Sequence, residues 1–275
     1  MTDPREQFRA AIERPELQID LAETALWVAA EEYPGLDVPA YLARLDGMAQ
    51  EVGPRVRAAG GLAARVDCLN DYLFRECGFA GNREHYDDPR NSFLNDVLDR
   101  GCGLPITLAI VYVEVGHRLG LPVRGVGFPG HFLAKLEGEP EILVDAFFGR
   151  TLTRGECAER LRAVLGSDAK LEPLDHLRAA TTREIIARLL TNLKQVYAHG
   201  GDWLRALACC DRLLLLTPDA ASELRDRAII YERLDCFSAA ASDVERLLEI
   251  VPESGGDGSL RARLTALRHR VGPLH

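Results

Sequence analysis

The sequence predicts an α+β protein in which a helical N-terminal part and a mixed core are followed by an all-helical C-terminal part. Apolar residues recur at helical spacing up to about residue 120, and the period shortens to that of strands between residues 123 and 147. After residue 183 the chain is helical again and repeats itself. We therefore expect a core made of a central helix and a small antiparallel sheet, with helical hairpins after it.

The helical N-terminal part is assigned to residues 1–60, and we expect it to pack on a core formed by residues 61–170. Proline in the interior of a helix removes a hydrogen bond and clashes with the preceding turn, so Gly53-Pro54 is expected to interrupt the second of its helices. The expected helices span Asp20–Glu32, begin near Val38, and follow the turn at Gly60-Gly61.

The central helix is expected over Ile106–Leu119, where apolar residues occupy nearly every face. A helix that is apolar all round is buried. Gly101-Cys102-Gly103 precedes it. Pro105 can begin it, because the N–H that proline lacks would have no partner in the first turn of a helix. Gly120-Leu121-Pro122 ends it.

Three short strands are expected after the central helix, because β-branched and aromatic residues alternate between turn residues there. They form an antiparallel meander, and a helix follows it. The strands are residues 123–128, 131–137 and 141–147, and the helix is residues 153–165.

The C-terminal region, residues 180–275, contains an internal repeat. Residues 187–218 align with residues 221–252 at an offset of 34, which resembles the tetratricopeptide repeat in its spacing of Tyr, Ala and Pro. Lys194 stands in the first copy where the second has the small Ala228. The matching pairs are Leu190 and Leu224, Tyr197 and Tyr231, Ala206 and Ala240, Leu213 and Leu247, and Pro218 and Pro252.

Repeats of this type form a concave groove that accepts a peptide or a helix, so a protein or peptide partner is expected. The groove would be lined by residues of the first helix of each hairpin. These are Asn192, Gln195 and His199 in the first copy and Arg225 and Glu232 in the second.

Cys102, His131 and Asp145 follow one another through the core. A thiolate nucleophile needs a base, and the base needs an orienting group. A cysteine, then a histidine, then a carboxylate along the chain is the arrangement of papain-like and transglutaminase-like sites. His131 and Asp145 can face each other across two adjacent strands. Alternatively, Cys102 is a small turn residue, His131 is a half-buried histidine with its partners satisfied, and Asp145 caps the turn before Phe147.

The stretch from Asn91 to Phe147 resembles the transglutaminase-like core of the SirB-type proteins, which carry C-terminal tetratricopeptide repeats. The resemblance implies a papain/transglutaminase-like fold with His131 and Asp145 at the positions of the family's His and Asp. The residues that carry it are Asn91, Leu94, Asn95, Val97, Leu98, Arg100, Gly103, Pro105, Ile106, Leu108, Leu119, Gly120, Pro122, Pro129, Gly130, His131, Phe132, Asp145 and Phe147.

The resemblance also bears on the nucleophile. In active transglutaminase cores the cysteine lies about four helical turns before the Gly-x-Pro that ends its helix, or roughly 15 residues. Counting back from Gly120 leads to Pro105, one helical turn after Cys102. The SirB-type element here is Arg-x-Gly-x-Pro-Ile-Ser-Leu, which contains no cysteine and is matched by residues 103–108.

Two functions follow. The first is a bacterial-type cytoplasmic regulatory or scaffolding protein with a catalytically degenerate transglutaminase-like domain and a protein-binding tetratricopeptide module. The alternative is a cysteine-dependent acyl-transfer enzyme, that is, a protease, amidase or transglutaminase. In that enzyme Cys102 is the nucleophile, His131 the base, Asp145 its orienting group and Asn95 an oxyanion donor.

Composition excludes other classes of function. With 33 Lys and Arg against 42 Asp and Glu, a net charge of −9 disfavours nucleic acid and anionic membranes as partners. The charged N-terminus and the lack of an apolar run of about 20 residues predict a cytoplasmic protein. Seven cysteines without a CxxC pair predict neither disulfides nor zinc. No cofactor motif occurs, and His85 beside Asp87 and Asp88 lacks a second histidine for a metal site.

Overall fold

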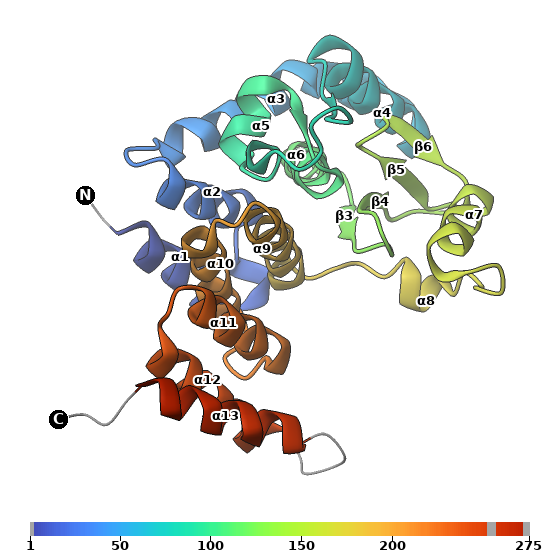
Figure 1. Ribbon diagram of the computed structural model, residues 1–275. Coiled ribbons are helices and arrows are strands. Elements are labelled where there is room, and N and C mark those ends of the chain that lie inside the picture. The colour runs from blue at the N-terminus through green and yellow to red at the C-terminus, as the bar shows by residue number, and fades with distance from the viewer. Residues whose placement is uncertain (1–2, 252–256, 272–275) are drawn as a thin grey trace. The chain divides into compact units, whose positions relative to one another are not determined.

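The computed structural model describes residues 3–251 and 257–271, and the chain divides into two compact units (Figure 1). The first unit is Met1–Ile186 and the second is Ala187–His275. The first is α+β and the second is all-helical, as the sequence predicts.

Four helices begin the first unit, and aspartates cap three of them. Asp3, Asp20 and Asp37 each accept a hydrogen bond from a backbone N–H of the first turn that follows, which has no partner within the helix. The helices are α1 (Pro4–Glu13), α2 (Leu21–Glu32), α3 (Val38–Ala58) and α4 (Gly61–Asn70), and a π-helical turn, Asp71–Glu76, extends α4.

Helix α3 continues through Gly53-Pro54, so the expected interruption was wrong. Pro54 cannot donate to the carbonyl of Gln50, one turn earlier, but Gln50 is exposed and its carbonyl can bind water. Val52 and Val56 are buried on either side of the proline, and their burial favours the helical conformation of the last turn.

Helix α6 (Pro105–Arg118) is the central element of the first unit, as the sequence predicts. Every residue from Pro105 to Gly116 is buried. Helix α5 (Leu94–Arg100) precedes it, and α3 and α5 both pack against it. Gly116 lies so close to strand β3 that a Cβ atom there would come within 2.7 Å of Val123 Cγ1.

The sheet beside α6 has four antiparallel strands in the order β3-β4-β5-β6, where three were expected. The additional strand, β6, has only three residues, too few for an alternating pattern. A tight turn with Gly149 at φ 64° pairs Asp145 with Arg150. The strands are β3 (Val123–Val126), β4 (Leu133–Leu136), β5 (Ile142–Asp145) and β6 (Arg150–Leu152).

A second, minimal sheet was not predicted. Strand β1 (Ala80–Gly81) pairs in parallel with β2 (Cys102–Gly103), and the N–H of Gly81 also donates to the carbonyl of Phe147. This pairing connects the segment before α6 to the loop that follows β5.

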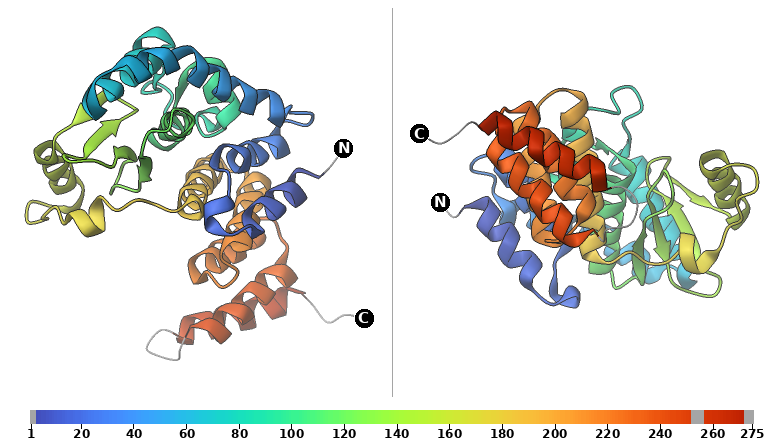
Figure 2. Two further views of the ribbon diagram at one scale, coloured as in Figure 1. Left: turned by 180° about the vertical axis from the view of Figure 1, so that it is seen from behind. Right: turned by 60° about the horizontal axis from the view of Figure 1, so that its bottom comes forward.

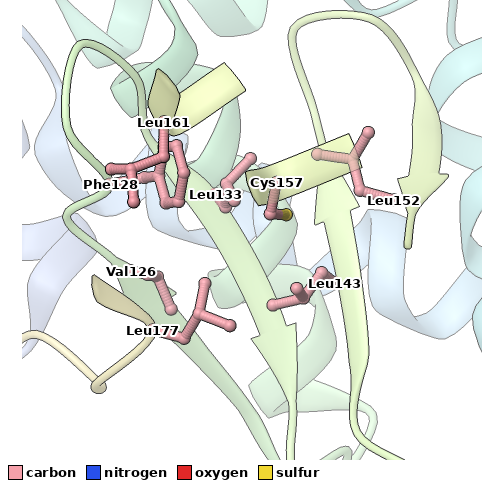
Figure 3. Packing of buried hydrophobic residues seen from close by; sticks show 8 residues of the cluster. All are labelled: Val126, Phe128, Leu133, Leu143, Leu152, Cys157, Leu161 and Leu177. Carbon is pink, nitrogen blue, oxygen red and sulfur yellow. The ribbon is translucent and has the colours of Figure 1, made fainter. Parts of the chain in front are cut away.

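Helix α7 (Arg154–Leu165) covers the face of the sheet that α6 leaves open. Its Cys157 and Leu161 enter an apolar cluster with strand residues and with Leu177, which follows the short helix α8 (Pro173–His176) (Figure 3). Burial raises the pKa of the Cys157 thiol, as expected of a cysteine that serves as a small apolar side chain.

The described part of the second unit forms two helical hairpins and a final helix, which lie side by side in Figures 1 and 2; the first residues of α9, up to Ile186, belong to the first unit. Ala206 and Ala240, matched by the repeat, are both fully buried where small residues are needed. Pro252 lies outside the described residues. The helices are α9 (Thr182–His199), α10 (Trp203–Leu216), α11 (Ala221–Arg233), α12 (Phe237–Ile250) and α13 (Asp257–Val271).

Lys194, at the position where the second repeat has the small Ala228, is stabilised by ion pairs. Its ammonium lies 2.7 Å from Glu223 Oε2 and 2.6 Å from Asp226 Oδ2, both on α11, and the residue is only 6% exposed. Burial disfavours the charged ammonium, but these two carboxylates outweigh it, so the pKa of Lys194 is raised.

Replacing Gly103 by alanine tests the close packing ahead of α6. The new Cβ would lie 2.7 Å from Thr107 Oγ1 and 2.8 Å from Val97 Cγ2. Both atoms are buried, so we expect Gly103→Ala to lower the free energy of unfolding by about 1–3 kcal/mol, measured by urea denaturation.

The control is Gly47→Ala at an exposed position of α3, where no side chain lies within 4 Å of the new Cβ. It should gain up to about 1 kcal/mol. Equal stability of the two variants would contradict this packing.

Candidate functional site

His131 enters the site from the turn between β3 and β4. Gly130 adopts φ 67°, and the N–H of His131 donates to the carbonyl of Phe128 at 3.0 Å, so the chain reverses just before the imidazole. The expected strand began at His131, but β4 starts two residues later. The contact with Asp145 is therefore diagonal and is made from the turn: His131 Nε2 lies 2.9 Å from Asp145 Oδ1.

Asp145, the last residue of β5, is fully buried and accepts hydrogen bonds on both oxygens. Oδ1 accepts from His131 and from the N–H groups of Phe147 and Phe148, at 3.1 and 3.3 Å. Orienting the histidine and capping the turn, considered above as alternatives, are thus done by the same atom. Burial opposes ionisation, but His131 and Arg160 outweigh it and lower the pKa of Asp145.

The sequence did not point to Arg160. Its guanidinium lies 2.6 Å from Asp145 Oδ2, and its side chain is 23% exposed. The arginine stands on α7, and only the packing of α7 against the sheet brings it to the carboxylate. The histidine, the carboxylate and the guanidinium therefore form one chain of charge-assisted contacts.

Two aromatic rings lie beside the imidazole. The ring centroids of Phe147 and Phe148 lie 6.1 and 6.2 Å from that of His131. Phe148 is 46% exposed, and the guanidinium carbons of Arg83 and Arg160 lie 5.6 and 5.5 Å from its ring centroid. Cations at this distance from a ring are attracted to it.

Cys102 is a half-buried free thiol in β2, where its backbone pairs with that of Ala80. Gly101, immediately before it, adopts φ 68° at the end of α5. Within the described part of the chain, the Cys102 thiol forms no hydrogen bond, and so none to His131.

Asn95, the candidate oxyanion donor, lies in the first turn of α5 and is 4% exposed. Its Oδ1 is buried and lacks a hydrogen-bond partner among the described residues. This buried atom is the amide's acceptor, whereas an oxyanion donor would use the Nδ2 group, so the role of Asn95 stays a prediction.

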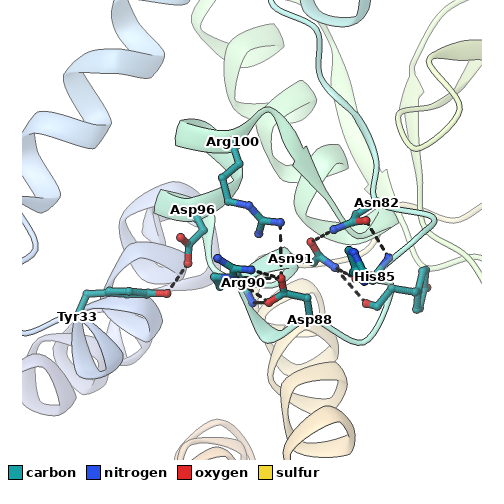
Figure 4. A network of polar contacts seen from close by, with 9 residues as sticks. Tyr33, Asn82, His85, Asp88, Arg90, Asn91, Asp96 and Arg100 are labelled. Carbon is teal, nitrogen blue, oxygen red and sulfur yellow. Dashed lines mark hydrogen bonds and ion pairs between the residues drawn. The ribbon is translucent and has the colours of Figure 1, made fainter.

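Asn91 holds together the segments in front of α6 (Figure 4). Its Nδ2 donates to the carbonyls of His85 and Tyr86, at 2.7 and 3.2 Å, and its Oδ1 accepts from Asn82. Its carbonyl accepts from the hydroxyl of Thr107 on α6 at 2.7 Å. The fully buried Asn91 thus connects the loop of residues 82–91 to the start of the central helix.

Polar contacts also hold the end of this loop, at Asp88, and the start of α5, at Asp96. Asp88 binds Arg90 at 2.8 Å and approaches Arg100 on α5 at 3.6 Å, while the hydroxyl of Tyr33 on α2 donates to Asp96 at 2.5 Å (Figure 4). Hydrogen bonding to Arg90 lowers the pKa of Asp88 despite its burial. Within the described ranges, no group of three or more His, Cys, Asp or Glu residues could hold a metal ion.

The predicted groove residues differ in their surroundings within the second unit. Gln195, His199 and Arg225 are exposed and Asn192 is half-buried. Glu232 accepts from Arg263 on α13 at 2.7 Å, so this carboxylate is occupied by the final helix.

Comparison with known proteins agrees with this architecture. Residues 39–191 match the transglutaminase-like superfamily, and residues 193–269 match the tetratricopeptide repeat. The fold and the match over more than half of the chain place the protein in the transglutaminase-like superfamily. No helix in residues 3–251 or 257–271 is both long and apolar enough to cross a membrane.

Its relatives define the group more narrowly. The chain is 40% identical to a UPF0162 protein of Xylella fastidiosa (strain Temecula1) over 90% of both chains. It is 29% identical to the UPF0162 protein YchA of Escherichia coli (strain K12), over 89% of this chain and 90% of the other. It is 28% identical to the protein SirB1 of Salmonella typhimurium (strain LT2), over 90% and 93%. The chain thus belongs to the transglutaminase-like family that includes the UPF0162 and SirB1 proteins.

Asp145→Asn tests whether the buried carboxylate is ionised and stabilising. At pH 7 the variant should lose about 3 kcal/mol or more of unfolding free energy, because Arg160 and His131 lose a charged partner. The pKa of Asp145 is lower in the folded protein, so its stabilisation is complete above the ordinary value of 3.8 and is lost as pH falls through the folded value.

The measurement is urea denaturation of both proteins from pH 7 down to pH 3. The difference between them should be largest at pH 7 and should shrink below about pH 4. Exposed Asp87→Asn is the control and should change stability little at any pH. A difference that stays constant with pH would mean that Asp145 does not titrate as described.

Proposed function

We propose that this protein is a regulatory or scaffolding protein that binds other proteins and that its transglutaminase-like domain is catalytically degenerate. The observation that carries the proposal is the first turn of α6, where a nucleophile would profit from the positive end of the helix dipole. That turn contains Pro105, Ile106 and Thr107, all buried. Proline and isoleucine carry no nucleophile.

Thr107 cannot replace the missing thiol, because its hydroxyl is already occupied. It donates to the carbonyl of Asn91 at 2.7 Å and accepts from the N–H of Leu104 at 3.0 Å. Breaking these bonds would leave buried polar groups without partners, which costs about 1–3 kcal/mol for each group. The hydroxyl therefore serves to fix the start of α6.

The contact of Arg160 with Asp145 also supports degeneracy. In a working triad the carboxylate charge stabilises the imidazolium that forms when the histidine takes a proton. Here the guanidinium shares that charge through Asp145 Oδ2. The arrangement is suited to holding β5, α7 and the His131 turn together.

Protein binding is assigned to the tetratricopeptide unit. Its match to that family supports a peptide or helix as the partner class. Gln195, His199 and Arg225 are the exposed candidates for contact, with half-buried Asn192 beside them in sequence. Glu232 would contribute through its ion pair with Arg263, which fixes the final helix.

The alternative function is cysteine-dependent acyl transfer from Cys102. It is favoured by one observation, the hydrogen bond between His131 Nε2 and Asp145 Oδ1, which would orient a catalytic base. In that case the Cys102 thiol would have to form a contact with the imidazole that is not among the hydrogen bonds of the described residues.

Labelling with iodoacetamide at pH 6 separates the two functions, with the modification of each cysteine measured by mass spectrometry. Exposed Cys236 on the second unit is the internal reference. We expect Cys102 to react no faster than Cys236, and His131→Ala to leave its rate unchanged, because an unactivated thiol is almost fully protonated at this pH. Fast labelling of Cys102 that is lost in His131→Ala would support the acyl-transfer enzyme and overturn degeneracy.

The binding role is tested by crosslinking in cells, followed by purification and mass spectrometry. The variant Gln195→Ala/Arg225→Ala should lose specific partners that the wild-type protein retains. Arg246→Ala on α12 is the matched control, because it breaks only exposed ion pairs, which contribute little to stability. An identical set of partners for all three proteins would contradict the assigned surface.

A further inference from the structure

A cavity of about 540 Å³ lies in the first unit beside the C-terminal half of α6, whereas Cys102 precedes the N-terminus of that helix. Ile19, Leu21, Val113 and Ile185 supply apolar lining. Its charged lining includes Asp20, Asp46, Glu114, Arg118 and Arg124. Neither proposed function uses this cavity, in which charged groups of both signs lie beside apolar side chains.

Glu114 is the buried acid of this cavity, at 5% exposure. Its Oε2 lies 2.6 Å from an Arg118 nitrogen, but the same guanidinium also binds Asp46 at 2.6 Å. One cation is thus shared by two carboxylates. Burial, and then the charge of Asp20, raise the pKa of Glu114 to about 7. Near neutral pH, therefore, this acid would gain from a further positive charge.

Arg124 on β3 supplies an uncommitted cation. It is exposed, and within the described part of the chain its guanidinium forms no hydrogen bond or ion pair. His117 does not compete with it for an anion. Burial, together with the charges of Arg124 and Arg118, lowers the pKa of His117, and its Nε2 lies 2.7 Å from the carbonyl of Val123.

We propose that this cavity binds a small zwitterion, a free amino acid or dipeptide with an apolar side chain. Its ammonium would lie near Asp20 and Glu114, its carboxylate on Arg124, and its side chain against Ile19, Leu21 and Val113. A simple anion would meet the three carboxylates, and a simple cation would leave Arg124 without a partner. A ligand that carries both charges satisfies both sides.

Binding should be coupled to proton release. The charged groups around Glu114 are Asp20 ahead of α2, Asp46 on α3, His117 and Arg118 on α6, and Arg124 on β3. An added ammonium favours ionised Glu114, so its pKa falls when the ligand binds. Near pH 7 the fraction of Glu114 that is protonated in the free protein therefore loses its proton.

Titration calorimetry of the full chain with three probes tests this site. L-leucine carries both charges, L-leucinamide only the ammonium and N-acetyl-L-leucine only the carboxylate. We expect leucine to bind most tightly. Arg124→Ala should weaken leucine roughly tenfold, the loss of one charge-assisted contact, and should leave leucinamide unaffected. The control Arg162→Ala, an exposed arginine of α7 outside the cavity, should change neither.

Repeating the leucine titration at pH 7 in buffers of different ionisation enthalpy measures the protons released. Glu114→Gln should abolish the release, and its thermal unfolding shows whether it has folded. If that variant does not fold, the Arg124→Ala comparison decides alone, because Arg124 is exposed. Failure of all three probes to bind the wild-type protein at millimolar concentration, or unchanged leucine affinity in Arg124→Ala, would overturn the proposal.

Discussion

The first unit depends on one buried carboxylate, that of Asp145. A charge inside a protein is tolerated only when several partners compensate for the water that it has lost. Asp145 has His131 and two backbone N–H groups on one oxygen and Arg160 on the other. These partners come from the turn before β4, the turn after β5 and helix α7, so the compensation of one charge fixes three segments.

A second constraint acts at the start of the central helix. Asn91, Gly103 and Thr107 lie so close together there that a methyl group on Gly103 would overlap its neighbours. Such packing leaves little freedom to the backbone next to Cys102. The hydrogen bonds of Asn91 hold the same segment in place. The contacts of Asn91 and Asp145 thus hold together the segments that carry Cys102 and His131.

Much of the fold could be predicted from the sequence because its signals are local. The apolar surface of α6, the change of period after Gly120 and the repeat offset of 34 each depend on residues close in the chain. What escaped prediction depends on tertiary contact. Strand β6 is too short to show a period, Pro54 is retained in α3 by the burial of Val52 and Val56, and Arg160 reaches Asp145 only through the packing of α7.

Lys194 has a consequence for how the second unit can change during evolution. In a repeat solenoid each repeat contacts only its neighbours, so repeats with matching interfaces can replace one another. Here the contacts of α9 with α11 include a buried ammonium between Glu223 and Asp226. Exchange of α11 for a standard repeat would leave a buried ammonium without counter-charges. The two repeats are therefore matched to each other, and insertion, deletion or shuffling of single repeats at this junction is restricted in a way that ordinary solenoids are not.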